Sequence, residues 1–206
     1  MHSLVHASFF LIAVVALAAD PSNGQRTSEA EAQSLAVAPG QGTFLVLSDI
    51  HFNPFANPKL VSELRSADAM RWGHIFDSDL DGGFPEYGQD TNYALLQSVL
   101  KAARRYQSIH HYDYVLVTGD YLAHAFSDKY RENGGDDAYY AVFVVKTMTF
   151  LSRMIEESFP SLPVYVVLGN NDSICGDYRQ SPGDELLRGM AEATYIGTDI
   201  RLRRGL

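Results

Sequence analysis

The segment YVLVTGDYLAH, residues 114–124, is the stretch on which our interpretation of the fold rests. Its first five residues are mostly β-branched or apolar, which is typical of a buried β-strand. The strand runs directly into Gly119-Asp120. The glycine lets the backbone turn, so that the carboxylate of Asp120 can face outward from the end of the strand.

Two further segments share this arrangement of a short apolar run followed by polar residues. Residues 43–47, TFLVL, lead into Ser48-Asp49-Ile50-His51, and residues 163–168, PVYVVL, lead into Gly169-Asn170-Asn171-Asp172. Ligands of parallel α/β sheets bind at the carboxyl ends of the strands. All three segments therefore carry polar side chains where such a site would form.

Between the predicted strands, apolar residues recur at helical spacing. A first helix is predicted behind an N-cap at Asp90-Thr91, and a second over residues 138–157. Their apolar faces are Leu95, Leu96, Val99, Leu100, Ala103 and Tyr106 in the first helix, and Tyr140, Val144, Thr147, Leu151 and Ile155 in the second. The resulting order of β, α, β, α and β predicts an α/β fold with a parallel sheet.

Residues 52–90 show no clear period and contain several prolines and glycines, so we expect a long loop there. Trp72, His74 and Tyr87 in this loop have two interpretations. They could cover the site and contact a substrate, or they could pack to order the loop, and the second is the more common role of such residues.

Composition and charge exclude some classes of protein. The 206 residues include 16 Lys and Arg against 25 Asp and Glu, for a net charge of −9, which argues against a protein that binds duplex nucleic acid through a basic face. A single cysteine excludes a framework of disulfides within the chain shown.

The amino terminus predicts export. Residues 7–19 form an uninterrupted run of small and apolar residues that is too short to span a bilayer, and residues 16–18 give an A-x-A cleavage pattern. We therefore expect a signal peptide over residues 1–19, a flexible linker over 20–41, and a secreted, periplasmic or lumenal protein. The alternatives are an uncleaved anchor or a buried core helix.

Four polar residues at the strand ends form a candidate metal-binding set: Asp49, His51, Asp120 and Asn170. Asp49 and His51 are two positions apart, and in an extended chain such residues point to the same side and can reach one ion. Carboxylates, an imidazole and an amide oxygen suit Zn²⁺ first, with Mn²⁺ or Fe²⁺ as alternatives.

The motifs Asp49-x-His51, Gly119-Asp120 and Gly169-Asn170 resemble the opening motifs of the calcineurin-like metallophosphoesterases, over about residues 43–178. The resemblance implies a four-layer α/β/β/α sandwich, of which residues 42–206 would supply the first β-α-β-α-β half. It also implies two divalent metal ions: Asp49 and His51 would bind the first, Asp120 would bridge both, and Asn170 would bind the second.

The GDYLAH motif of residues 119–124 is similar to a G-D-x-x-A-H motif of the acid-sphingomyelinase-like branch and, more loosely, to endopolyphosphatases. The chain departs from the family at Asn171, where most members have a histidine. Asparagine cannot supply a proton, although it can donate a hydrogen bond to a phosphoryl oxygen. If a helical turn follows the strand, His124 lies on the same face as Asp120 and can protonate the leaving oxygen. The alternative is that His124 only packs or faces solvent.

The resemblance implies a hydrolase of phosphomonoester, phosphodiester or phosphoanhydride bonds that uses a metal-activated water, and the amino terminus predicts that this hydrolase is exported. Its substrate would be a small-molecule or lipid phosphoester, and contact with a membrane is expected only through a lipid substrate. No Ser-His-Asp or Cys-His arrangement offers a protein nucleophile instead.

Later motifs of the family, G-H and G-H-x-H, do not occur after Asn170, and no histidine follows His124. We therefore expect the chain to be the amino-terminal part of a longer protein. The alternative is a truncated or degenerate module of the same fold, which binds metal or phosphate without turnover.

Overall fold

A three-stranded parallel sheet forms the centre of the computed structural model, which describes residues 42–79, 82–176, 179, 181–184 and 186–190. The strands are β1 (Phe44–Leu47), β2 (Tyr114–Val117) and β3 (Val164–Val166), in the order β1-β2-β3. In this register Phe44 pairs with Tyr114, and Val115 pairs with Val164. The predicted strands and the α/β class are confirmed.

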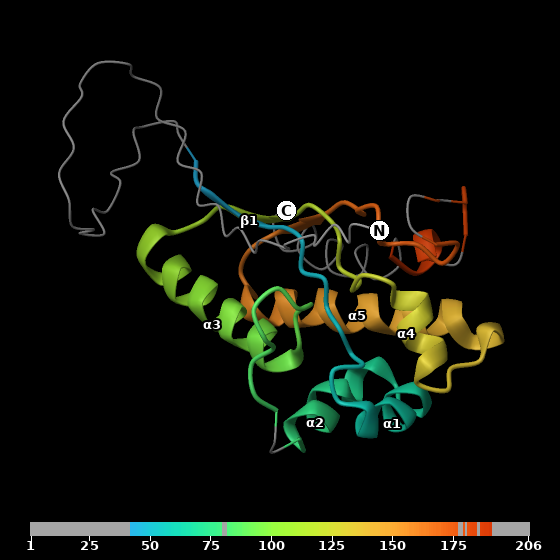
Figure 1. Cartoon of the computed structure of the whole chain (residues 1–206). Helices are drawn as coiled ribbons and strands as arrows, with labels where there is room; N and C mark the ends of the chain where they lie inside the picture. Colours follow the sequence, from blue (N-terminus) through green and yellow to red (C-terminus); the bar gives the residue numbers. More distant parts are fainter. Residues whose placement is uncertain (1–41, 80–81, 177–178, 180, 185, 191–206) are drawn as a thin grey trace, which may run out of the picture.

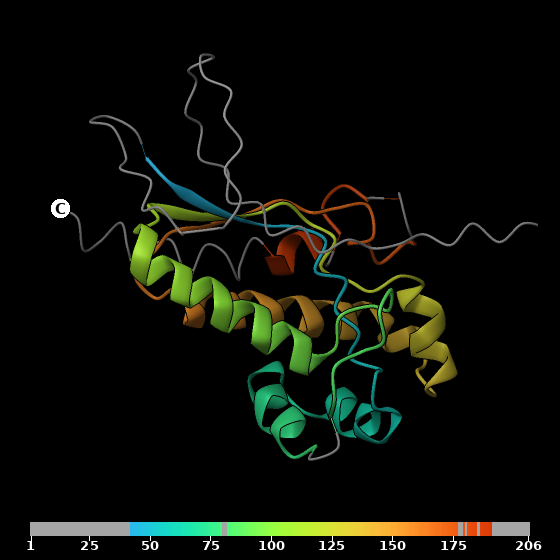
Figure 2. The ribbon, with the colours of Figure 1, turned by 60° about the vertical axis from the view of Figure 1, so that its left-hand side comes forward.

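Two long helices cover one face of the sheet, α3 (Tyr93–His110) and α5 (Tyr140–Ser158) (Figures 1 and 2). The strand side chains that alternate toward these helices are buried in one apolar core: Leu45, Leu47, Val115 and Val117. Burial on every second residue is the pattern expected for a strand with one covered face.

The opposite face of the sheet is apolar and partly exposed in the described part of the chain. The ring of Phe44 stacks on Tyr114 with centroids 4.9 Å apart, and Tyr114 meets Tyr165 edge to face at 5.7 Å. Tyr165 is 53% exposed. A four-layer sandwich places a second sheet on such a face, so the described residues are consistent with one sheet and its helices from a larger domain.

Both predicted helices are present, with one correction at the start of α3. Its N-cap is Asn92, whose side chain accepts from the backbone N–H of Leu95 at 3.0 Å, and not Asp90-Thr91. Leu96, Leu100 and Ala103 are buried as expected, Leu95 and Val99 are partly buried, and Tyr106 is 47% exposed. In α5 four of the five predicted residues, Val144, Thr147, Leu151 and Ile155, are buried, and Tyr140 is partly buried.

The segment 52–90 is not the long loop that we expected. It contains two short helices, α1 (Val61–Ser66) and α2 (Trp72–Asp77), each preceded by a 3-10 turn, η1 (Pro58–Leu60) and η2 (Ala69–Arg71). Trp72 is fully buried, with its ring 5.3 Å from Phe143 of α5, and its indole N–H donates to the carbonyl of Leu64 at 3.1 Å. Trp72 therefore orders this segment, while His74 and Tyr87 are exposed.

A further short helix, α4 (Phe126–Glu132), and the 3-10 turn η3 (Asp137–Tyr139) follow β2 and were not predicted. The predicted signal peptide 1–19 and linker 20–41 lie outside the described residues. Among the helices described here, none is long and apolar enough to cross a membrane.

Gly119, directly before Asp120, permits the first prediction. Its φ is +98°, and an added Cβ would lie 2.2 Å from the backbone nitrogen of Gly169. Because backbone strain and a clash between the ends of β2 and β3 add together, Gly119→Ala should lower the free energy of unfolding by more than about 3 kcal/mol in chemical denaturation.

The matched control is Gly88→Ala. Gly88 has a similar φ of +85°, but nothing lies within 4 Å of the position of an added Cβ. Only left-handed strain applies there, so the loss should be about 1–2 kcal/mol. Equal losses in the two variants would contradict the proposed contact between the strand ends.

Candidate metal centre

The chain segments that follow β1 and β2 stay paired beyond the strands themselves. The backbone N–H of His51 donates to the carbonyl of Asp120 at 2.8 Å, and that of Phe52 donates to Tyr121 at 2.7 Å. This pairing brings the polar residues after the two strands to the same edge of the sheet, as the sequence predicted.

Asp49, His51 and Asp120 form a cluster at this edge, with one ligand-type atom of each lying within 4.8 Å of the others. The Nε2 atom of His51 is 3.8 Å from Oδ1 of Asp49 and 3.9 Å from Oδ2 of Asp120. These three predicted ligands are therefore together in space.

The backbone reason for this convergence differs from the predicted one. Asp49 and His51 are not extended: their φ angles are 54° and 43°, and that of Asp120 is 52°. They are three of the five non-glycine residues with positive φ in the described part of the chain. Left-handed backbone is costly for such residues and concentrates at functional sites, so the strain itself marks this cluster.

His51 is buried, at 5% exposure, and its ring is fixed by its second nitrogen. Nδ1 lies 3.1 Å from the carbonyl oxygen of Leu122. A carbonyl can only accept, so in the tautomer in which Nδ1 carries the proton this bond forms and Nε2 presents a lone pair toward the two carboxylates. A backbone partner on the far nitrogen is the usual way in which a metal-binding histidine is oriented.

Each carboxylate of the cluster has one oxygen that accepts a hydrogen bond from a group outside the cluster. Oδ2 of Asp49 accepts from the hydroxyl of Ser48, and Oδ1 of Asp120 accepts from the backbone N–H of Asn171 at 2.9 Å. The remaining oxygens and Nε2 of His51 face one another. Two carboxylates at such close range repel unless a cation lies between them, so this donor set fits a divalent ion.

The turn after β3 carries Asn170 and Asn171 beside this cluster. Asn170 is exposed, and its side-chain amide donates to Oδ1 of Asn171 at 2.8 Å. Asn171 is buried, and its side chain lies 3.2 Å from Nδ1 of His51. The structure thus places Asn171 in contact with two predicted ligands, His51 and Asp120, while Asn170 occupies the adjacent position of the turn.

Asp172 was not singled out from the sequence. Its buried carboxylate accepts from three backbone N–H groups: Tyr121 at 2.8 Å, Leu122 at 3.1 Å and Gly169 at 2.8 Å. Burial raises the pKa of Asp172 above its ordinary value, against the opposite effect of the three N–H donors. Asp172 ends the Gly169-Asn170-Asn171-Asp172 motif that follows the third strand, and its place in that motif is the signal that could have found it.

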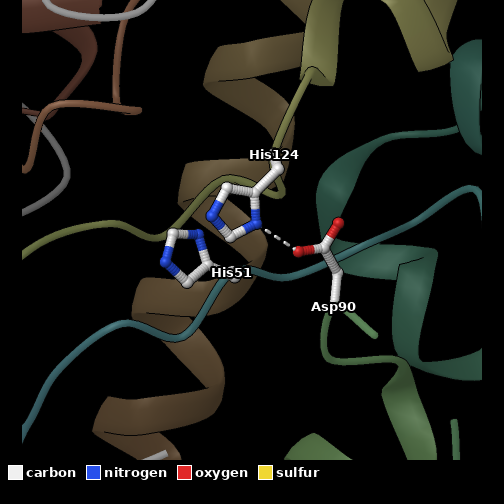
Figure 3. A group of neighbouring side chains, drawn as sticks. All are labelled: His51, Asp90 and His124. Carbon is white, nitrogen blue, oxygen red and sulfur yellow. Dashed lines mark hydrogen bonds and ion pairs between the residues drawn. The ribbon is translucent and has the colours of Figure 1, made fainter. Parts of the chain in front are cut away.

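A second group at the site joins His51, Asp90 and His124 (Figure 3). The rings of His51 and His124 stack with centroids 4.1 Å apart and planes at 19°. Nδ1 of His124 lies 2.7 Å from Oδ1 of Asp90, whose other oxygen accepts from Lys129. His124 is therefore at the site, but the predicted helical turn is absent, because α4 begins only at Phe126.

This second group suits a hydrogen-bond network better than a metal ion. The lone pairs of an imidazole lie in the ring plane, and nearly parallel stacked rings do not direct them to a common point. The ammonium of Lys129 already neutralises Asp90. Burial alone would raise the pKa of Asp90, but its bonds to Lys129 and His124 outweigh burial and lower it.

Comparison with known proteins agrees with this geometry. The sequence model of the calcineurin-like phosphoesterase family matches residues 42–200, which include every residue of the two groups described above. Among curated proteins, none matches the chain.

Proposed function

Because the chain belongs to the calcineurin-like phosphoesterase family, whose members in general are metal-dependent phosphoester hydrolases, we propose that this protein hydrolyses a phosphoester at the edge of its sheet. The observation that carries the proposal is the convergence of Asp49, His51 and Asp120. Two carboxylates and an imidazole of fixed orientation are ligands for a divalent ion.

We assign the metal ligands as the family resemblance implies. Asp49 and His51 would hold one ion, Asp120 would be shared, and Asn170 would contribute to a second ion. Zn²⁺ is our first choice, with Mn²⁺ or Fe²⁺ as alternatives. When bound, such ions would supply Lewis-acid chemistry: they would lower the pKa of water, so that a nucleophile for phosphorus is available at neutral pH, and they would offset the charge of the phosphoryl oxygens.

Two side chains of the protein then have roles toward the substrate. Asn171, buried between His51 and Asp120, donates a hydrogen bond from its amide to a phosphoryl oxygen. His124 uses Nδ1 toward Asp90, so in the doubly protonated ring Nε2 is the nitrogen that can give its proton to the leaving oxygen. The His124 side chain is 46% exposed, so a substrate can reach it.

We propose a small-molecule or lipid phosphoester as the substrate class, as in the acid-sphingomyelinase-like proteins that the GDYLAH motif resembles. Turnover of a lipid phosphodiester, a small phosphomonoester and polyphosphate, compared side by side, would distinguish these phosphoesters from each other and from a phosphoanhydride substrate.

Asp120→Asn tests the metal centre. Asp120 contacts both His51 and the turn after β3, so its loss should remove metal and activity together. Metal content by mass spectrometry and phosphodiester turnover should both fall at least about tenfold. The control is Asp128→Asn, an exposed aspartate of α4. Full metal content with near-normal turnover in Asp120→Asn would refute the assignment.

His124→Ala tests the proton donor. Turnover of a substrate with a poor, alkoxide-type leaving group should fall by about 10²–10⁴-fold, the usual contribution of general acid catalysis. A nitrophenyl ester should lose much less, because its leaving oxygen needs no proton. Equal losses on both substrates, with metal content unchanged, would show that His124 orients the phosphoryl group instead.

Export is a separate part of the proposal and rests on residues 7–19 and the A-x-A pattern at 16–18. Mass spectrometry of the protein from the culture medium or periplasm should find an amino terminus near residue 19 or 20. An intact Met1 on protein from the cytosol would contradict it.

A further inference from the structure

Asp90 is a buried carboxylate that the α3 helix does not use. Its side chain is 6% exposed. The N-cap of α3 is Asn92, so capping of the helix does not explain why Asp90 is buried. A charge that is removed from water needs partners, and those of Asp90 are His124 on Oδ1 and Lys129 on Oδ2. Neither residue belongs to α3, so the position of Asp90 needs another explanation.

The backbone fixes Asp90 next to the metal centre. The following residue, Thr91, donates from its N–H to the carbonyl of His51 at 3.0 Å, and its own carbonyl accepts from Asn53 at 2.7 Å. Phe52 and Thr91 form a parallel bridge. The chain that carries Asp90 is therefore attached to the segment that carries His51.

The ring of His124 is restrained on two sides as a result. Oδ1 of Asp90 lies 2.7 Å from Nδ1 of His124 and accepts its hydrogen bond. The ring of His51 stacks on one face of the His124 ring, with the two centroids 4.1 Å apart. The backbone N–H of Ala123 donates to Phe52 at 3.2 Å, which ties the neighbouring residue to the same segment. With Nδ1 and one face engaged, Nε2 is the ring atom left to face a substrate (Figure 3).

We propose that Asp90 is a positioning residue: its carboxylate accepts from Nδ1–H of His124 and orients the ring on His51, so that Nε2 faces the leaving oxygen of the substrate and transfers its proton there when both ring nitrogens are protonated. This inference rests on the proposed function only for the transfer of a proton from Nε2 of His124 to the leaving oxygen. The hydrogen bond and the ring orientation are properties of the folded protein, and they can be measured without metal or substrate.

The first experiment measures by ¹⁵N NMR which ring nitrogen of His124 carries the proton in the neutral imidazole of the metal-free, full-length protein. His124→Ala assigns the signal. The wild type should show His124 protonated at Nδ1, and Asp90→Ala should shift the ring toward the Nε2–H tautomer. The same Nδ1–H signal in both proteins would overturn the proposal.

Lys129→Met is the matched control, because it removes the other partner of Asp90 and leaves the bond to His124 possible. If Asp90 acts on His124, this variant should keep the Nδ1–H tautomer and the ratio of turnover between poor and good leaving groups. If the ion pair with Lys129 only stabilises the fold, Lys129→Met and Asp90→Ala should behave alike in both measurements, and the proposal fails.

The second experiment is a double-mutant comparison on the poor-leaving-group substrate. Asp90→Ala should lower kcat by about 10–10²-fold with little change in KM, the usual result of a misplaced group. On the nitrophenyl ester the loss should be below about threefold. In the His124→Ala background, Asp90→Ala should cost nothing more, because its effect passes through His124. A full, additive loss in the double variant would overturn the proposal.

The two experiments separate failure of this inference from failure of the proposed function. If no phosphoester is hydrolysed but the tautomer of His124 depends on Asp90, the positioning stands and the phosphoesterase assignment fails. If phosphoesters are hydrolysed and neither the tautomer nor the leaving-group ratio responds to Asp90→Ala, the assignment stands and the positioning fails.

Discussion

The carboxylate of Asp172 is the interaction on which the geometry of the strand ends depends. It accepts hydrogen bonds from the backbone N–H groups of Tyr121, Leu122 and Gly169, which lie beyond the last paired residues of β2 and β3. Buried backbone donors need acceptors, and here one charged side chain satisfies three of them. The turn after β3 is thereby fixed against the segment after β2, so the metal centre has its shape because this acid is buried.

Much of the fold could be predicted because its signals are local. Strands β1 to β3 are runs of β-branched and apolar residues, and α3 and α5 are long enough for helical spacing to emerge. Helices α1 and α2 have six residues each, fewer than two turns, and show no period. Their position depends on Trp72, which packs against Phe143 and Phe150 of α5, a contact between residues more than seventy positions apart.

The candidate site was predictable to the same extent. Asp49, His51 and Asp120 could be found because they directly follow strands, although their left-handed backbone could not, since it depends on pairing between the two segments. The role of Asp90 was hidden by its place before a helix, where an aspartate ordinarily acts as an N-cap. Its partner His124 is 34 positions away, and only the tertiary fold brings the two together.

The charges at the strand ends connect stability to metal binding. Burial raises the pKa of Asp172 most, and the negative charge of Asp120 raises it further, so the acid that fixes the turn and the carboxylate that faces the site oppose each other. Backbone N–H groups offset part of this repulsion, and one of them, from Asn171, is bound to Asp120 itself. A divalent cation between Asp49 and Asp120 would offset more of it. Binding free energy at such a centre is then also folding free energy for the turn after β3, because the cation relieves the same repulsion that opposes the burial of Asp172.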